Sequence, residues 1–355
     1  MIFLGSCSGD FYAVDASTGR VRWSYDVKQD GNQSSFHGNP VLTTDLVVIG
    51  VDRGTDPQGQ GHVYAFERAT GRVRWKHLAA PGVSSDILTD GSLIITLAQT
   101  GELIGLDIHS GQLVWKKKVT DAGRDRYLPS PALLNHVVYA GGYMGTLTAV
   151  NAQTGAPLWQ RSLESDIRLQ PVIAGDGLYV VTDTHIYKVA TSSGRVLDNV
   201  SLDATPIFQP VAMANSIVLE FQDHTVRSLS TAEKMKTSWS QKAAADLTTH
   251  GPFFVGGDVV VADATNQLMA FKLSDGALDW TFKFADLKAP ITVIASEQNH
   301  LYVGTQGGTL SMLELEPPSK PLPAPVPAPI SRGPSRPRYN QRSGKVQPAR
   351  LIADR

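Results

Sequence analysis

The residue types that most often carry out chemistry in proteins are sparse and scattered in this sequence. It contains one cysteine, Cys7, and nine histidines. A single cysteine excludes an internal disulfide bond and a zinc site built from several cysteines. No two histidines have the spacing of a metal-ligand pair, so we predict no metal site among them: His37, His62, His77, His109, His136, His185, His224, His250 and His300.

The stretch VDRGTDPQGQGH, residues Val51–His62, suggests a calcium hypothesis. Asp52 and Asp56 are suitable ligands, but the Asp-x-Asp-x-Asp-Gly order of a calcium loop is absent. An ordinary loop between two strands is the favoured interpretation. The sequence also contains no Gly-x-Ser-x-Gly nucleophile motif and no phosphate-binding loop. We therefore predict that the protein is not an enzyme, and we assign no catalytic, cofactor-binding or metal-binding residue.

The first ten residues, MIFLGSCSGD, place Leu4 three positions before Cys7, as in the cleavage site of a bacterial lipoprotein. The apolar run before the cysteine is only Met1–Leu4, whereas the apolar region of a signal peptide has about 7–15 residues. The stretch IFLGSCSGDFYAVD instead aligns with Leu301–Glu314, which reads as strand, turn and strand. We therefore interpret the start of the chain as part of the fold and predict that it contains no signal peptide.

Composition and charge divide the chain into two parts. The 355 residues are 42% hydrophobic and 18% charged, as in a soluble globular protein. The net charge of −1 indicates neither nucleic-acid binding nor membrane binding, and no apolar run reaches the roughly 18 residues of a membrane span. Residues 317–355 contain eight Lys/Arg, one acidic residue and ten of the 21 prolines. We predict a folded domain at 1–316 and a Pro-rich, basic, disordered tail at 317–355.

A recurring Asp-x-x-Thr-Gly-x-x-x-Trp pattern is the strongest signal in the sequence. Consecutive good copies, such as FYAVDASTGRVRW and VYAFERATGRVRW, end at tryptophans 40 to 52 residues apart, a period typical of propeller blades. Two copies are degenerate, with Asp198 in the tryptophan place of one and Met235 in the glycine place of the other. The repeated tryptophans are Trp23, Trp75, Trp115, Trp159, Trp239 and Trp280, and the repeated glycines are Gly19, Gly71, Gly111, Gly155, Gly194 and Gly276.

The segments between these landmarks read as short strands. Runs such as DLVVIG and NHVVYAGG are rich in β-branched residues and bounded by Asn, Asp or Gly. Because a lone strand pair cannot bury its faces, the units must stack. We count eight units and predict an all-β, monomeric, eight-bladed β-propeller of four-stranded antiparallel blades. The first unit lacks its first strand and the last lacks its fourth, so we expect the N-terminal closing strands to be missing from this chain.

The two incomplete units are predicted strand by strand. The first contains strands at Ile2–Cys7, Phe11–Asp15 and Val21–Asp26. The last contains strands at Ile291–Ser296, Leu301–Thr305 and Thr309–Leu315.

With this repeat the chain resembles the PQQ-like, quinoprotein-type β-propeller repeat family over residues 1–316. The Gly-His and Trp-Asp signatures of WD40 repeats are missing from their places. The resemblance implies that the six tryptophans and the glycines Gly19, Gly71, Gly111, Gly155 and Gly276 are structural, with each tryptophan docking its outer strand onto the neighbouring blade. Asp198 and Met235 depart from the pattern and put regular docking of the fifth and sixth blades in question.

Within this family, residues Arg124–Trp159 most resemble the BamB-like scaffold proteins of outer-membrane assembly. That resemblance implies a non-catalytic scaffold in the periplasm or cell envelope, without PQQ or another cofactor, that binds a protein component of outer-membrane assembly. It also places the loop before the strand at residue 131 in the partner-binding region. Arg124, Arg126 and Tyr127 are therefore candidate partner-binding residues, with a plain solvated loop as the alternative.

Two other functions are compatible with the same repeat. True quinoprotein oxidoreductases use a pair of adjacent cysteines beside PQQ, and this chain has only Cys7. A ligand-sensing ectodomain is the second alternative. Fold-level analogy alone does not choose among these functions.

Overall fold

The computed structural model describes residues 1–31, 35–54, 59–121, 128–175, 177–248, 251–297 and 300–315. They form two compact units, Met1–Asp203 and a second unit that begins at Ala204. The named elements are strands except for two single-turn 3₁₀ helices, η1 (Val27–Asp30) and η2 (Tyr143–Gly145). Within the described ranges, no helix has the length and apolar character of a membrane span.

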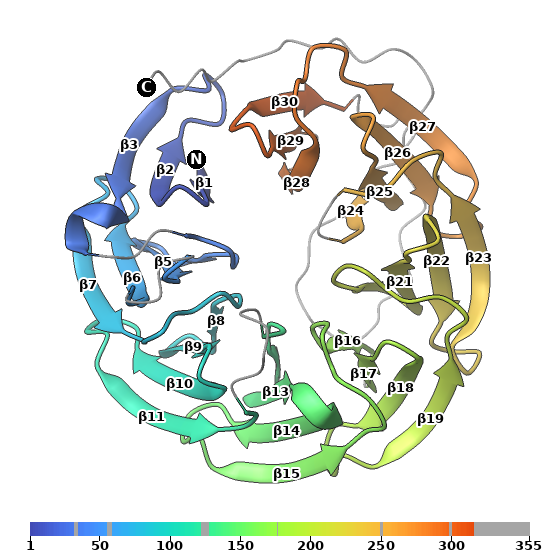
Figure 1. Cartoon of the computed structure of the whole chain (residues 1–355), viewed down its shortest axis with the longest axis horizontal. Coiled ribbons are helices and arrows are strands. Elements are labelled where there is room, and N and C mark those ends of the chain that lie inside the picture. The colour runs from blue at the N-terminus through green and yellow to red at the C-terminus, as the bar shows by residue number, and fades with distance from the viewer. Residues whose placement is uncertain are drawn as a thin grey trace. The chain divides into compact units, whose positions relative to one another are not determined.

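The first unit contains five antiparallel sheets, blades 1 to 5, whose strands are ordered as in the sequence (Figure 1). Blade 1 is β1 (Ile2–Gly5), β2 (Asp10–Val14) and β3 (Val21–Asp26); blade 2 is β4 (Val41–Leu42), β5 (Leu46–Val51), β6 (His62–Glu67) and β7 (Val73–Leu78); blade 3 is β8 (Leu88–Thr89), β9 (Leu93–Leu97), β10 (Glu102–Asp107) and β11 (Leu113–Lys118). Blade 4 is β12 (Ala132–Leu134), β13 (Val137–Gly141), β14 (Thr146–Asn151) and β15 (Pro157–Ser162); blade 5 is β16 (Val172–Ala174), β17 (Gly177–Val181), β18 (His185–Ala190) and β19 (Val196–Ser201).

The second unit contains three antiparallel sheets, blades 6 to 8, with the same strand order. Blade 6 is β20 (Val211–Met213), β21 (Ser216–Glu220), β22 (Thr225–Ser230) and β23 (Lys236–Lys242); blade 7 is β24 (Phe253–Val255), β25 (Asp258–Ala262), β26 (Gln267–Lys272) and β27 (Leu278–Lys283); blade 8 is β28 (Ile291–Glu297), β29 (His300–Thr305) and β30 (Leu310–Glu314).

These sheets confirm the predicted fold class, an all-β, eight-bladed β-propeller with antiparallel blades. Blades 1 and 8 have three strands each in the described residues, and the other six have four. The strand bounds differ by one or two residues from those predicted. The largest difference is at β1, which ends at Gly5 because Ser6 and Gly9 form a turn: Ser6 N donates to Asp10 O at 2.9 Å, and Gly9 N donates to Ser6 O at 3.1 Å.

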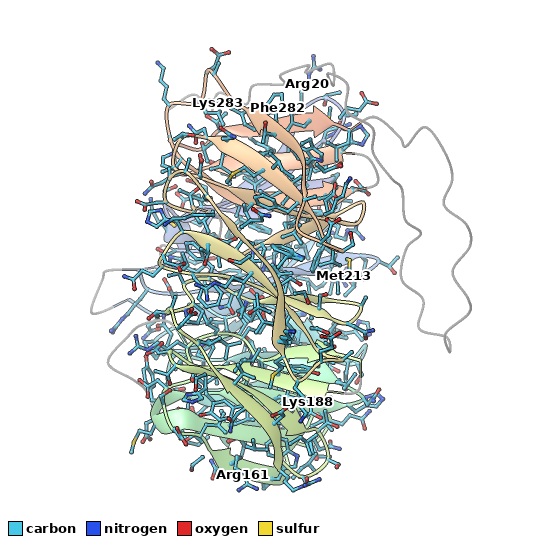
Figure 2. The ribbon with its side chains drawn as sticks, turned by 90° about the vertical axis from the view of Figure 1, so that its right-hand side faces the viewer. Arg20, Arg161, Lys188, Met213, Phe282 and Lys283 are labelled. Carbon is cyan, nitrogen blue, oxygen red and sulfur yellow. The ribbon has the colours of Figure 1, made fainter. Side chains whose placement is uncertain are left out.

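Burial follows the position of each strand in its blade. All residues of β5, β9, β17 and β25 are buried, which explains their continuous β-branched and aliphatic runs. The fourth strands are mostly exposed, as on β15, where five of six residues face solvent; Arg161 of this strand is labelled in Figure 2. The core of each unit therefore lies between successive blades, on the middle strands.

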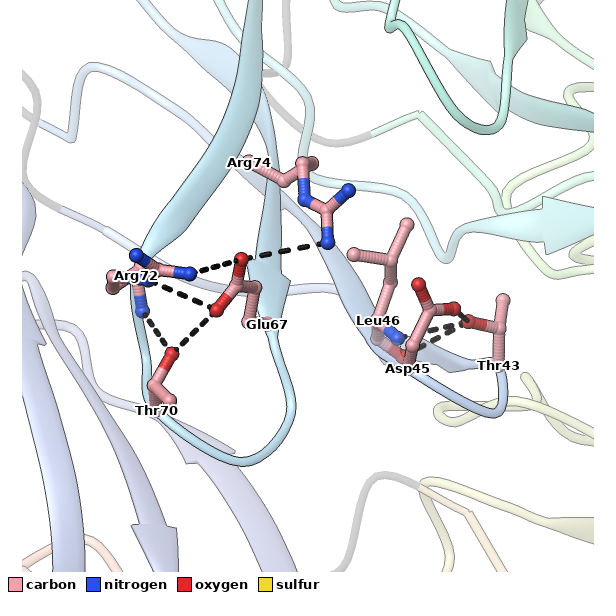
Figure 3. A network of polar contacts seen from close by, with 7 residues as sticks. All are labelled: Thr43, Asp45, Leu46, Glu67, Thr70, Arg72 and Arg74. Carbon is pink, nitrogen blue, oxygen red and sulfur yellow. Dashed lines mark hydrogen bonds and ion pairs between the residues drawn. The ribbon is translucent and has the colours of Figure 1, made fainter.

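The turn between the third and fourth strand is closed by a local polar network in blades 1 to 4. In blade 2 the Glu67 carboxylate accepts from the Thr70 hydroxyl at 2.8 Å and from two guanidinium nitrogens of Arg72 at 2.9 and 3.0 Å (Figure 3). Gly71 N donates to Glu67 O at 2.9 Å, and Gly71 has a φ of +73°, which favours glycine. In blade 4 the Asn151 side chain caps the turn instead, accepting from two backbone N–H groups.

Each of five indole rings joins its blade to the next along the chain. The indole N–H of Trp75 donates to Ile108 O at 3.0 Å, and that of Trp115 donates to Ala152 O at 3.0 Å. The ring also covers the turn glycine of the next blade so closely that a Cβ added at Gly111 would lie 2.5 Å from the ring of Trp75. The five pairs of tryptophan and glycine are Trp23 with Gly71, Trp75 with Gly111, Trp115 with Gly155, Trp159 with Gly194, and Trp239 with Gly276.

A second feature of these contacts is the small residue paired with each tryptophan on the third strand. Ala13 faces Trp23, Gly105 faces Trp115, and Ser228 faces Trp239. A β-bulge follows each pair, so one residue next to the tryptophan is skipped in the register. In blade 5 the pair is Lys188 with Asp198, so this blade has neither the small residue nor the tryptophan; Lys188 is labelled in Figure 2.

The two degenerate copies still form complete hairpins. The β18–β19 pair keeps the bulge although Asp198 replaces tryptophan. In blade 6 Met235 occupies the glycine place with a φ of +55° and is 1% exposed. A buried methionine therefore holds a left-handed backbone where the good copies have glycine.

Trp280 differs from the other five tryptophans. Its indole lies near the carboxyl group of Asp258 within blade 7 and favours the ionised form of that group. Asp258 is 7% exposed, and burial, followed by the negative charge of Asp279, raises its pKa to about 6. Lys272 Nζ lies 3.3 Å from Asp279 Oδ1 and partly offsets that charge.

The contact between Trp115 and Gly155 can be separated from the backbone conformation of the glycine. Gly155 has a φ of +67°, and a Cβ added there would lie 2.6 Å from Trp115. Gly175 has a φ of +60° with no atom within 4 Å of its added Cβ. We expect Gly175→Ala to lower the free energy of unfolding by about 1 kcal/mol, and Gly155→Ala by about 2–4 kcal/mol because overpacking adds to the strain. Urea unfolding measures both; equal losses would contradict the indole contact.

The raised pKa of Asp258 predicts a pH-dependent stability. Its folded-state pKa lies above the unfolded value, so its stabilising contribution is complete below about pH 4 and is lost as the pH rises through 6. Asp258→Asn removes the charge, and we expect it to raise the free energy of unfolding by about 1–3 kcal/mol at pH 7.5 and to change it little at pH 4. Urea unfolding at the two pH values tests this, with exposed Asp286→Asn as the control; an equal effect at both pH values would contradict it.

Candidate functional site

The three residues that the sequence marks for partner binding, Arg124, Arg126 and Tyr127, lie outside the described residues. The segments on either side of them are described. Asp121, whose side chain is 92% exposed, follows β11, and Leu128 is 6% exposed within a core cluster of blades 3 and 4. The described surface that follows this segment in the chain belongs to blade 4.

The most prominent feature of that surface is the turn between β13 and β14, with the sequence Gly142-Tyr143-Met144-Gly145. Met144 is 82% exposed, the largest value among the exposed large hydrophobic residues. Its backbone is left-handed, with φ 57° and ψ 29°, which costs a non-glycine residue roughly 1 kcal/mol. The turn therefore holds a largely exposed methionine in a strained backbone conformation.

Hydrogen bonds from both sides hold the Met144 turn in place. Met144 N donates to Asp166 Oδ1 at 2.7 Å, from the connection that follows β15. Tyr143 N donates to Thr120 Oγ1 at 3.2 Å, from the connection that follows β11. The exposed side chain is thus mounted on a fixed backbone, so binding through it costs little ordering of the turn.

The two flanking glycines allow this close fit. A Cβ added at Gly142 would lie 2.1 Å from Thr120 Oγ1, and one added at Gly145 would lie 2.3 Å from Leu163 O. Both positions therefore need glycine because the neighbouring connections press against the turn.

Charged side chains border the turn toward blade 5. Arg168 NH2 lies 3.7 Å from Asp166 Oδ2, and Arg168 Nε lies 3.8 Å from Asp183 Oδ2. Arg168 is 57% exposed, so these ion pairs remain available to a partner. An exposed apolar side chain beside mixed charges is suited to contact with a protein rather than to chemistry on a small substrate.

The histidines and aspartates considered from the sequence form no metal-binding cluster in the part of the chain that the structure describes. Asp52 is 2% exposed, and its carboxylate accepts from Gly54 N at 2.7 Å and faces His37 Nδ1 at 2.9 Å. Asp56, its proposed calcium partner, lies outside the described residues. The Asp52 oxygens therefore already have protein partners.

The exposed turn at Met144 and the pairing of His37 with Asp52 were not predicted from the sequence. The Gly-Gly-x-x-Gly pattern around Met144 was the available signal, because three glycines in five positions mark a tight turn. His37 and Asp52 are 15 residues apart, and only the register of blade 2 brings them together.

Three comparisons relate the chain to known proteins. A family model described as "Outer membrane protein assembly factor BamB" matches residues 1–200 and 201–319. The protein of that name from Yersinia pestis is 25% identical over 328 residues, which cover 87% of this chain and 81% of that protein. The crystal structure of BamB from Moraxella catarrhalis matches with a TM-score of 0.71 at 21% identity, covering 88% of this chain and 93% of that chain. At this identity the structural match shows the fold.

A further relative has an enzymatic name. The dehydrogenase subunit of a quinone-dependent alcohol dehydrogenase from Gluconacetobacter polyoxogenes is 28% identical over 176 residues. The match covers 44% of this chain but only 24% of that enzyme, so most of the enzyme lies outside the matched region.

The left-handed backbone of Met144 gives a prediction about stability. Glycine at position 144 relieves the strain but increases the entropy of the unfolded chain, so we expect Met144→Gly to leave the free energy of unfolding within about 1 kcal/mol of the original. Met144→Val should lower it by about 1–2 kcal/mol because a β-branched residue tolerates this conformation poorly. Urea unfolding measures both. The same pair of changes at Ala214, which has a φ of 52°, is the matched control.

Proposed function

Because the chain belongs to the family of the outer membrane protein assembly factor BamB, we propose that it is a non-catalytic scaffold in the bacterial cell envelope that binds a protein component of outer-membrane assembly. The family match over residues 1–200 and 201–319 supports this function most directly. The propeller fold agrees with it, since blades of this kind present turns and connections on a rigid frame. The periplasm is the compartment that this role implies.

The turn that carries Met144 is the part of the surface proposed to meet the partner. Its exposed methionine supplies an apolar anchor, and the ion pairs of Arg168 supply a polar surround. Arg124, Arg126 and Tyr127 stay partner-binding candidates from the sequence alone. The fixed backbone of the turn favours binding without large rearrangement. The proposed partner surface therefore extends from the connection after β11 to the connection after β15.

A quinone-dependent oxidoreductase is the second candidate, and the partial match to an alcohol dehydrogenase subunit favours it. That match covers 24% of the enzyme, and the adjacent cysteines expected beside PQQ are missing because Cys7 is the single cysteine of the chain. Titration of the purified protein with PQQ and calcium, followed by dye reduction with an alcohol, tests this candidate. Turnover would replace the scaffold proposal.

Site-specific photo-crosslinking in cells tests the scaffold. A photoreactive amino acid at position 144 should crosslink to an identified outer-membrane assembly protein, whereas one at Leu158, 51% exposed on β15, should not. We also expect Met144→Asp to lower the amount of folded β-barrel protein in the outer membrane, by about twofold or more, with Leu158→Asp as the control.

Two outcomes separate the function from its location on the surface. If removal of the whole protein leaves β-barrel assembly unchanged, the proposed function is wrong. If removal impairs assembly but Met144→Asp does not, the function stands and the partner surface lies elsewhere.

A further inference from the structure

Three side chains from different parts of the first unit form a line that ends at the single cysteine of the chain. Cys7 Sγ lies 3.8 Å from His37 Nε2, and His37 Nδ1 lies 2.9 Å from Asp52 Oδ2. A nucleophile, a base within hydrogen-bonding reach and a carboxylate that orients the base are the three parts of an activated nucleophile. We refer to Cys7, His37 and Asp52 as the thiol triad.

The backbone around the thiol triad is tied together by hydrogen bonds. Cys7 lies in the turn between β1 and β2, His37 in the connection before β4, and Asp52 directly after β5. Phe36 N donates to Ser6 O at 3.3 Å, and Ser35 Oγ donates to Cys7 O at 3.3 Å. Asp52 N donates to Ser35 O at 3.0 Å. The connection that carries His37 is therefore held between the turn of Cys7 and the strand end of Asp52.

The carboxylate of Asp52 is fixed more firmly than the other two groups. It is 2% exposed and accepts from Gly54 N at 2.7 Å and from Gln99 Nε2 at 3.3 Å. These donors leave it an acceptor toward His37. An N–H at Nδ1 of His37 satisfies that acceptor, and in this tautomer Nε2 presents a lone pair toward Cys7 Sγ.

The sulfur of Cys7 is accessible from solvent. Cys7 is exposed, and the His37 side chain is 23% exposed, so small molecules can reach the sulfur. Reactive cysteines occupy partly exposed sites beside a basic group, whereas structural cysteines are buried in apolar surroundings. Cys7 has the first kind of environment.

We propose that Cys7 is an activated thiol that undergoes thiol–disulfide exchange with small-molecule disulfides, with His37 as its base and Asp52 as the residue that positions His37. In this step His37 Nε2 takes the proton from Sγ, and the thiolate attacks one sulfur of the disulfide. A new S–S bond joins Cys7 to one half, and the other half leaves as a thiolate that takes the proton back from His37. Cys7 is oxidised, and the reagent disulfide is reduced to one thiol.

The product follows from the cysteine count. Because the chain has no second cysteine, no internal thiol can displace the bound half, so the mixed disulfide accumulates. This site is distinct from the Met144 turn and does not depend on the scaffold function.

The rate of exchange with hydroxyethyl disulfide tests the proposal. This probe is uncharged, so the carboxylate of Asp10 in the same turn, which accepts from Ser8 Oγ at 3.0 Å, does not repel it. Mass spectrometry of the full chain at pH 7 follows the mixed disulfide. We expect His37→Ala to slow the reaction about 10-fold or more, and Asp52→Asn to slow it several-fold. His109→Ala, in the turn of blade 3, should leave the rate unchanged.

Denatured protein supplies the reference rate. In about 8 M urea the original and His37→Ala chains should react equally, and the folded original should react faster than both. The proposal is overturned if the folded original reacts no faster than the denatured chain, an outcome that does not require any variant to fold. Equal rates for the folded original and folded His37→Ala would also overturn it.

Discussion

The hydrogen bond from an indole N–H to a backbone carbonyl of the next blade, together with the glycine beneath the ring, is the interaction on which the fold depends. Trp23, Trp75, Trp115 and Trp159 make it in the first unit and Trp239 makes it in the second. The indole covers apolar area and satisfies a polar group at the same point. Each of these rings joins its own blade to the following one, so stability is built from neighbour to neighbour, as in other repeat folds.

This arrangement divides the two ends of each blade between different tasks. One end carries the turns between third and fourth strands, where the tryptophans of preceding blades pack against the turn glycines. The other end carries the turns between second and third strands and the connections between blades. In the first unit, both the Met144 turn and the thiol triad lie at this second end. Both proposed sites therefore lie at the end that the indole contacts leave free.

The sequence predicted the repeated parts of the fold well, because they depend on local chemistry repeated many times. The turn pattern around Gly71 and the aliphatic run of β5 each imply their structure from adjacent residues alone. The residues paired with the tryptophans, such as Gly105 and Ala13, were not predicted because they are defined by register across a hairpin. The line from Cys7 to Asp52 was missed for the same reason, since it joins three segments of two blades. Whether Arg124, Arg126 and Tyr127 bind a partner stays a prediction.

The bulge beside each tryptophan has a consequence for the exposed margin of the blades. A fourth strand with a skipped residue is locally twisted and cannot offer an unbroken row of N–H and C=O groups to a foreign strand. The three lysines that end β11, Lys116 to Lys118, add charge to the same margin. In the scaffold role proposed above, the protein would meet unfolded β-barrel chains, whose strands lack pairing partners. An irregular, charged margin is a poor template for such strands and would therefore limit co-aggregation with them.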